Sequence, residues 1–206
     1  MPTILPSRFL LLLFALCLPA MPAMAGPAGA VTAQSGASFA VGKLGSRPLH
    51  KGRTLFAGDI LVTARDGSLV VRLRNGVTIV LAADSRVALA AVAETGAAQA
   101  MTTRLHLLRG VVRVLVEGLQ APDRVQLGSA VLRVEMGNGD LVMAQSADGQ
   151  STGAYLVEGA PMQALTADSG TPLAPGSGLR NAPGGGLEAW PANARNRALE
   201  RLQTYR

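Results

Sequence analysis

The stretch that decides the fold is GDILVTARDGSLVVRLRNGVTIVLAADS, residues 58–85. It consists of short apolar runs with period-two alternation, which is typical of β-strands with one buried side. Gly58, Gly67, Gly76 and Ser85 recur at intervals of nine residues, and each opens the next apolar run. Glycine supplies turn conformations that a Cβ atom would obstruct. The stretch therefore predicts successive short strands joined by tight turns.

The same patterning extends outward in both directions, from Ser38 to Met162, and predicts about a dozen strands with almost no helix. Aromatic residues make up only 3% of the chain, whereas sandwich interiors usually use large aromatic side chains. We therefore predict an all-β domain with a solenoid-like or rolled architecture and a short C-terminal helix. The alternative is a β-sandwich, in which the nine-residue spacing only reflects ordinary hairpin length.

The first 25 residues have the pattern of a cleavable export signal. One charge, Arg8, precedes an apolar run, and Ala23 and Ala25 provide the small residues that signal peptidase accepts. A membrane anchor would need an apolar run of roughly 20 residues, about twice the length found here. The single cysteine, Cys17, lies inside the signal. We expect a periplasmic or secreted protein with no transmembrane span after cleavage and no disulfide.

The composition divides the exported part into four further segments. Residues 26–37 are expected to be a flexible N-terminus, 38–178 the β domain, and 179–190 a Gly/Pro-rich linker. Residues 191–206 have apolar positions at helical spacing among arginines, which predicts a basic amphipathic helical tail. Two roles are open for this tail: Trp190 and Leu199 cap the open end of the β domain, or the helix contacts a partner or membrane.

An ordered set of short motifs resembles the FecR domain family over residues 38–178. The motifs are GDILVT at 58–63, GSLVVRL at 67–73, NGVTIVL at 75–81, Ser85, LHLLRGVV at 105–112, VEG at 157–159 and LAPG at 173–176. The resemblance implies an all-β periplasmic or extracellular module. The best understood members of the family receive a signal from an outer-membrane siderophore transporter and pass it across the inner membrane to a sigma factor.

This chain departs from that family pattern in three ways. We expect no cytoplasmic segment before a membrane helix. Asn75-Gly76-Val77 replaces an Asp-Gly-Ser type of step, and Met136-Gly137-Asn138 stands where a Gly-Thr step is usual. The resemblance therefore implies a stand-alone exported binding or scaffold module.

The conspicuous glycine and acidic positions are interpreted as structural turns. Asp59 follows a turn glycine, and its carboxylate is expected to accept backbone N–H bonds and fix the turn. The complete set of predicted turn residues is Gly58, Asp59, Gly67, Gly76, Gly110, Glu158 and Gly159.

The chain offers few residues for chemistry. His50 and His106 are the only histidines, and with no cysteine after the signal they give no zinc ligand set. His106 alternates with leucines and should point outward from a strand. No nucleophile, base and acid can be grouped from the sequence. We therefore predict no catalytic residue, no metal and no cofactor.

One basic patch remains as a candidate site. Lys43, Arg47, His50, Lys51 and Arg53 fall within eleven residues that contain no Asp or Glu. Nucleic acid is not the expected target, because the segment lacks aromatic stacking residues there and the chain is exported. We interpret Lys43, Arg47, Lys51 and Arg53 as a contact for an anionic surface, with a solvated loop as the alternative.

These observations favour a non-enzymatic exported module that binds an envelope or extracellular protein or an anionic polymer. A structural surface or scaffold protein is the first alternative, and a periplasmic part of a signalling pathway is the second. An unrecognised hydrolase is the remaining rival, with no candidate residues to support it.

Overall fold

The structure is a computed structural model that describes residues 26–95, 100–182 and 186–203. The predicted export signal lies outside the described residues. Within them, seventeen strands and one helix are assigned. The predicted all-β class with a short C-terminal helix is therefore confirmed, and more strands form than the expected dozen.

The strands form two sheets that share one strand, β9. Sheet A has the order β4-β1-β6-β7-β9-β12-β13-β16-β17, and all its neighbours are antiparallel. Its strands are β4 (Thr54–Phe56), β1 (Pro27–Ser35), β6 (Ser68–Leu73), β7 (Thr78–Leu81), β9 (Ala100–Val116), β12 (Gly139–Gln145), β13 (Thr152–Gly159), β16 (Gly178–Asn181) and β17 (Leu187–Ala189).

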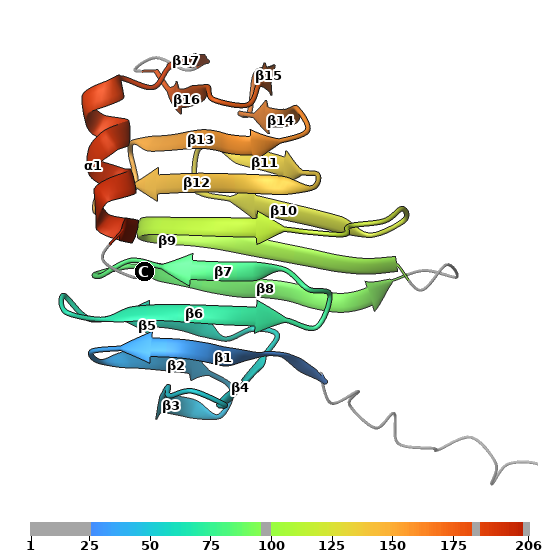
Figure 1. Cartoon of the computed structure of the whole chain (residues 1–206), viewed down its shortest axis with the longest axis vertical. Helices are drawn as coiled ribbons and strands as arrows, with labels where there is room; N and C mark the ends of the chain where they lie inside the picture. Colours follow the sequence, from blue (N-terminus) through green and yellow to red (C-terminus); the bar gives the residue numbers. More distant parts are fainter. Residues whose placement is uncertain (1–25, 96–99, 183–185, 204–206) are drawn as a thin grey trace, which may run out of the picture.

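Sheet B has the order β3-β2-β5-β8-β9-β10-β11-β14-β15, and only the pair β9 and β10 is parallel. Its other strands are β3 (Gly45–Pro48), β2 (Ser38–Gly42), β5 (Ile60–Thr63), β8 (Arg86–Thr95), β10 (Arg124–Gly128), β11 (Arg133–Met136), β14 (Met162–Leu165) and β15 (Gly170–Leu173). In both sheets the strand order follows the chain closely. The result is a stack that rises along its long axis, as Figure 1 shows.

The long strand β9 passes from one sheet to the other at Gly110. Residues 100–109 pair with β8 in sheet B, and residues 112–115 pair with β7 in sheet A. Gly110 has a φ of 89°, and a Cβ atom there would lie 2.4 Å from the hydroxyl of Ser85. This glycine, predicted as a turn residue, is thus a bend inside a strand. It requires glycine because of both its backbone conformation and the close approach of Ser85.

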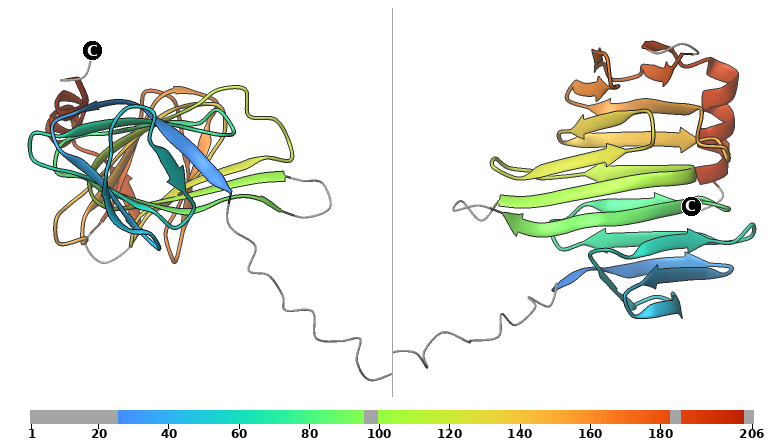
Figure 2. Two further views of the ribbon diagram at one scale, coloured as in Figure 1. Left: turned by 90° about the horizontal axis from the view of Figure 1, so that it is seen from below. Right: turned by 180° about the vertical axis from the view of Figure 1, so that it is seen from behind.

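Aliphatic side chains fill the space between the two sheets. The main core contains only alanine, valine, leucine, isoleucine and methionine among its fully buried members. These side chains come from alternate positions of each strand, as period-two patterning requires. The end-on view in Figure 2 shows the two sheets as walls that face each other around this core.

The helix α1 (Ala192–Gln203) covers part of the outer face of sheet A. A second small core forms there, in which Trp190, Ala198 and Leu202 pack against outward side chains such as Val142. Trp190 lies directly on Gly153, where a Cβ atom would come within 2.4 Å of the indole ring. The helix therefore runs along the side of the stack, as Figure 1 shows. It does not cover the open end of the β domain, which is the position expected if Trp190 and Leu199 formed a cap.

Two segments expected to be irregular carry strands instead. Residues 26–37, expected as a flexible N-terminus, contain β1, which pairs with β4 and β6 and buries Ala28 and Val31. Residues 179–190, expected as a linker, contain most of β16 and all of β17. No helix within the described ranges has the length and hydropathy of a membrane span.

Candidate functional site

A buried ion pair organises the N-terminal end of the stack. Arg47 of β3 forms a bidentate pair with Asp59, with 3.2 Å between Nη1 and Oδ1 and a second contact between Nη2 and Oδ2. Their side chains are only 9% and 3% exposed. The Arg47 guanidinium also lies 5.4 Å from the centre of the Phe56 ring. Arg47 is therefore a structural residue, and its predicted place among the surface cations is corrected.

Asp59 stabilises a turn, as predicted, in addition to pairing with Arg47. Its carboxylate accepts the backbone N–H of Phe56 at 2.7 Å. A Cβ atom on Gly42 would lie 2.4 Å from Oδ1 of Asp59, so the β2–β3 hairpin can approach the carboxylate only because glycine occupies that position. The ion pair and this close approach together hold the hairpin against β5.

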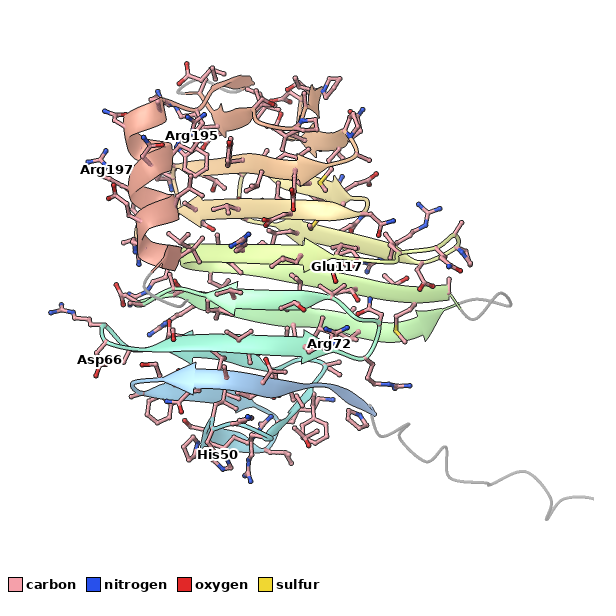
Figure 3. All side chains as sticks on the ribbon, in the orientation of Figure 1. His50, Asp66, Arg72, Glu117, Arg195 and Arg197 are labelled. Carbon is pink, nitrogen blue, oxygen red and sulfur yellow. The ribbon has the colours of Figure 1, made fainter. Side chains whose placement is uncertain are left out.

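The other cations of the predicted patch remain on the surface. Lys43, His50, Lys51 and Arg53 are exposed, and Leu44 at the hairpin tip is 70% exposed. We call these five residues the N-terminal patch; Figure 3 shows His50 at this end of the molecule. In the described part of the chain no carboxylate pairs with its lysines or with Arg53. The patch is thus a locally uncompensated positive surface.

A shallow groove of about 380 Å³ lies within this patch. It is lined by Leu44, Arg47, His50, Gly52, Arg53, Thr54 and Phe56. The floor is formed by the stacked Arg47 and Phe56, and the rim carries His50 and Arg53. Such a groove suits an anionic group next to a small apolar one.

The remaining predicted turn residues occupy different places in the fold. Gly58 and Gly76 lie in turns with φ values of 90° and 84°. Gly67 is needed for space, since a Cβ atom would lie 2.4 Å from the carbonyl oxygen of Ala37. Glu158 and Gly159 close β13 beside Gly139 of β12. These positions shape the scaffold and do not converge on one site.

The sequence reasoning missed a second ion pair, on the outer face of sheet A. Arg113 of β9 donates from Nε to both oxygens of Asp140 at 2.9 and 3.0 Å. The hydrogen bonds with Asp140, with a smaller contribution from Glu158, raise the pKa of the Arg113 guanidinium above its ordinary value. The signal for this pair was weak, because 27 residues separate its members.

A hollow of about 590 Å³ lies at the C-terminal end between β16 and the loops next to it. Its polar lining includes Thr166, Asp168 and Asn181, and its arginine, Arg180, is paired with Glu188. The hydroxyl of Thr166 bonds to Ser169, and the amide of Asn181 bonds to backbone groups. Among the described side chains, no three His, Cys, Asp or Glu residues gather as a metal site would require.

Comparison with known proteins gives one family match. Residues 59–160 match the family model described as FecR protein. The resemblance predicted from the sequence motifs is therefore confirmed over these residues. No curated protein sequence matches the chain.

Two solved structures share the fold. Both are from Parabacteroides distasonis ATCC 8503 and are named "putative anti-sigma factor". The first has a TM-score of 0.53 at 10% identity, covering 68% of this chain and 64% of that one. The second has a TM-score of 0.51 at 12% identity, covering 67% of this chain and 62% of that one. The chain thus spans less than two thirds of either neighbour, and at this identity the likeness concerns the fold.

Proposed function

We propose that this protein is an exported, non-enzymatic FecR-like binding module of the cell envelope. In this proposal the N-terminal patch contacts an anionic component of the envelope. The observation that carries the proposal is the pairing of Arg47 with Asp59. This pairing occupies the Asp59 carboxylate, and no ion pair among the described residues neutralises Lys43, Lys51 or Arg53 beside the exposed Leu44.

The chemistry of the patch supports an anionic target. Carboxylate and phosphate groups are attracted to clustered exposed cations, and the attraction is screened by salt. Lys43 lies at the tip of the hairpin that the buried ion pair holds against β5, and Lys51 and Arg53 lie in the loop between β3 and β4. The polymer of the cell wall and the head groups of lipids both offer such anions, so the two sources need separate measurements.

The test is a binding experiment with the purified protein on two probes, peptidoglycan sacculi and vesicles that contain phosphatidylglycerol. The variant replaces Lys43, Lys51 and Arg53 with serine and keeps Arg47. Since each cation near an anionic surface contributes about 1 kcal/mol, we expect binding to the true target to weaken by roughly 100-fold. The probe on which the loss occurs identifies the source of the anion.

The matched control replaces Arg65, Arg72 and Arg197 with serine. These three arginines are exposed, and Figure 3 shows Arg72 and Arg197 away from His50 of the patch. The control removes the same number of positive charges as the patch variant. It should bind as the unchanged protein does. Equal losses in both variants, or retention that salt does not affect, would contradict the proposal and favour a scaffold that associates with itself or with polymer.

A part in envelope signalling is a second candidate, favoured by the match to the FecR family model. The name of the two structural neighbours points the same way. Removing the protein from the producing cell should then change transcription that depends on one of its sigma factors. Transcription reporters for each sigma factor would measure this, and unchanged reporters would remove the candidate.

A further inference from the structure

We propose that the outer face of sheet B is a docking surface for an anionic lipid bilayer. This surface borders the N-terminal patch, with which it shares Leu44, and the inference goes beyond the function proposed above. It follows from the placement of apolar and cationic side chains on that face and from the contrast with sheet A.

The exposed large apolar side chains of the described residues gather on one side of the molecule. Phe39, Val41, Leu44 and Leu108 are 40%, 42%, 70% and 38% exposed. Phe39 and Val41 point outward from β2 because Ser38 and Ala40 alternate with them into the core. Leu108 lies on the same face in β9, and Leu44 follows β2 at its turn. Single exposed apolar residues are ordinary, but a cluster on one face indicates an interaction surface.

The register of sheet B extends this apolar area. Phe39 lies opposite Val62 of β5, and Val41 lies opposite Ile60. Ile60 in turn lies opposite Ala88 of β8. These partners are partly exposed. Neighbouring strands are about 4.8 Å apart, so the apolar area crosses at least three strands.

Unpaired arginines occupy the adjoining strands of the same face. Arg86, Arg104, Arg124 and Arg133 are exposed, one on each of β8, β9, β10 and β11. Within the described ranges none of them has a carboxylate partner. Glu135, hydrogen-bonded to Gln126, is the one acidic side chain at the outward positions from β9 to β14 that the structure describes. The face therefore has a strong excess of positive charge.

His106 adds to the polar part of this surface. It lies opposite Gly128, which in turn lies opposite Arg133. Because Gly128 has no side chain, the space above it is bordered by His106 Nδ1 at 3.7 Å and Arg133 Cγ at 3.9 Å from the position of a Cβ atom. The backbone carbonyl oxygen of Leu105 lies 3.9 Å from the same position, so the glycine leaves room for about a methyl group between His106 and Arg133.

Sheet A shows that this arrangement is particular to sheet B. Its outward apolar side chains Val80, Val142 and Tyr155 are covered by α1 and Trp190. Its arginines Arg113 and Arg180 are paired with Asp140 and Glu188. The outer face of sheet A is thus covered where α1 packs, although Arg72 of β6 is exposed elsewhere on that sheet. The outer face of sheet B has no such covering helix and keeps its apolar area and most of its arginines exposed.

The occupant with matching chemistry is a bilayer. Phe39, Val41 and Leu108 do not line any of five hollows of the described structure, whereas protein interfaces commonly place their anchor residues in pockets. A second copy that presented the same cationic face would be repelled. A bilayer offers a plane of anionic head groups above an apolar layer, which accepts dispersed cations and projecting apolar side chains together.

The test measures cosedimentation of the purified protein with vesicles of phosphatidylglycerol and phosphatidylcholine, and with vesicles of phosphatidylcholine alone. A variant with Arg86, Arg104 and Arg133 replaced by serine should bind the anionic vesicles roughly 100-fold more weakly. A Phe39→Ser and Val41→Ser variant should also bind more weakly, and the binding that remains should be more sensitive to salt. Circular dichroism checks that each variant is folded.

A position-specific measurement accompanies the partitioning experiment. Phe39→Trp places a new tryptophan on the face, while the natural Trp190 is buried beneath α1 as a constant reference. Vesicles with brominated acyl chains should quench the Phe39→Trp protein more strongly than the unchanged protein. Such quenching requires the face to reach the acyl boundary.

The outcomes separate this inference from the proposed function. Loss of vesicle binding in the sheet B variants but not in the Lys43, Lys51 and Arg53 variant supports docking through sheet B. The reverse pattern overturns the inference and leaves the proposed function intact. An equal loss in the Arg65, Arg72 and Arg197 control, equal binding to phosphatidylcholine alone, or no extra quenching of Phe39→Trp also overturns it.

Discussion

The outer faces of the two sheets have similar strands but different surroundings. Sheet A and sheet B share β9 and enclose the same aliphatic core. On sheet A, α1 covers the outward apolar side chains and carboxylates neutralise Arg113 and Arg180. On sheet B, Phe39 and Val41 remain exposed. Arg109 is paired there with Asp84, whereas Arg86, Arg104, Arg124 and Arg133 have no carboxylate partner among the described residues. The difference shows that the outer face of a sheet stays available for binding when no other element of the same chain, such as α1, packs on it.

The largest expected difference between the faces concerns their aromatic residues. Trp190 is 9% exposed and Phe39 is 40% exposed. Trp190→Ala removes the anchor of α1, and we expect the free energy of unfolding to fall by about 3–5 kcal/mol. Phe39→Ala should cost less than about 1 kcal/mol. Urea denaturation followed by circular dichroism measures both, and similar values would mean that α1 does not stabilise sheet A.

Two valines at outward positions provide a smaller and better matched comparison. Val142 is fully buried under α1, whereas Val41 is 42% exposed on sheet B. Val142→Ala should reduce the free energy of unfolding by about 2 kcal/mol, because it removes buried apolar contacts. Val41→Ala should change it by less than about 0.5 kcal/mol. A large cost for Val41→Ala would show that sheet B is also covered, for instance by a second copy.

The arginines give the smallest expected difference. Arg113→Ala leaves the carboxylate of Asp140, only 4% exposed, without its partner. We expect a loss of about 1–2 kcal/mol, less than for a fully buried pair because the Arg113 side chain is 41% exposed. Arg104→Ala should leave the free energy of unfolding almost unchanged. A clear loss for Arg104→Ala in denaturation experiments would indicate an intramolecular partner for the sheet B arginines.

Much of the core could be predicted from the sequence, because strand periodicity is local. Alternation placed Leu61, Leu69 and Ile79 in the interior, where each is fully buried. Strands were harder to predict in segments where apolar and polar residues do not alternate clearly. Residues 27–35 are rich in small and polar residues, and they become β1 only because β4 and β6 supply hydrogen-bonding partners more than 20 residues away.

The candidate site was predictable in part. The basic segment correctly identified Lys43, Lys51 and Arg53 as exposed cations near each other in the chain. It could not separate Arg47 from them, because the burial of Arg47 depends on Asp59, twelve residues away, and on the space above Gly42. Arginine is mostly a surface residue, so composition alone favours exposure.

The sequence by itself determined that this protein is an all-β stack with an aliphatic interior and glycine corners. It could do so because the alternation of side chains and the demands of tight turns are properties of neighbouring residues. Only the tertiary structure decided that Arg47 is buried, that β9 bends from one sheet into the other at Gly110, and that α1 covers sheet A rather than sheet B. Those outcomes depend on which segments distant in the sequence pack together. The burial of a side chain and its ion pairs are determined only by that packing.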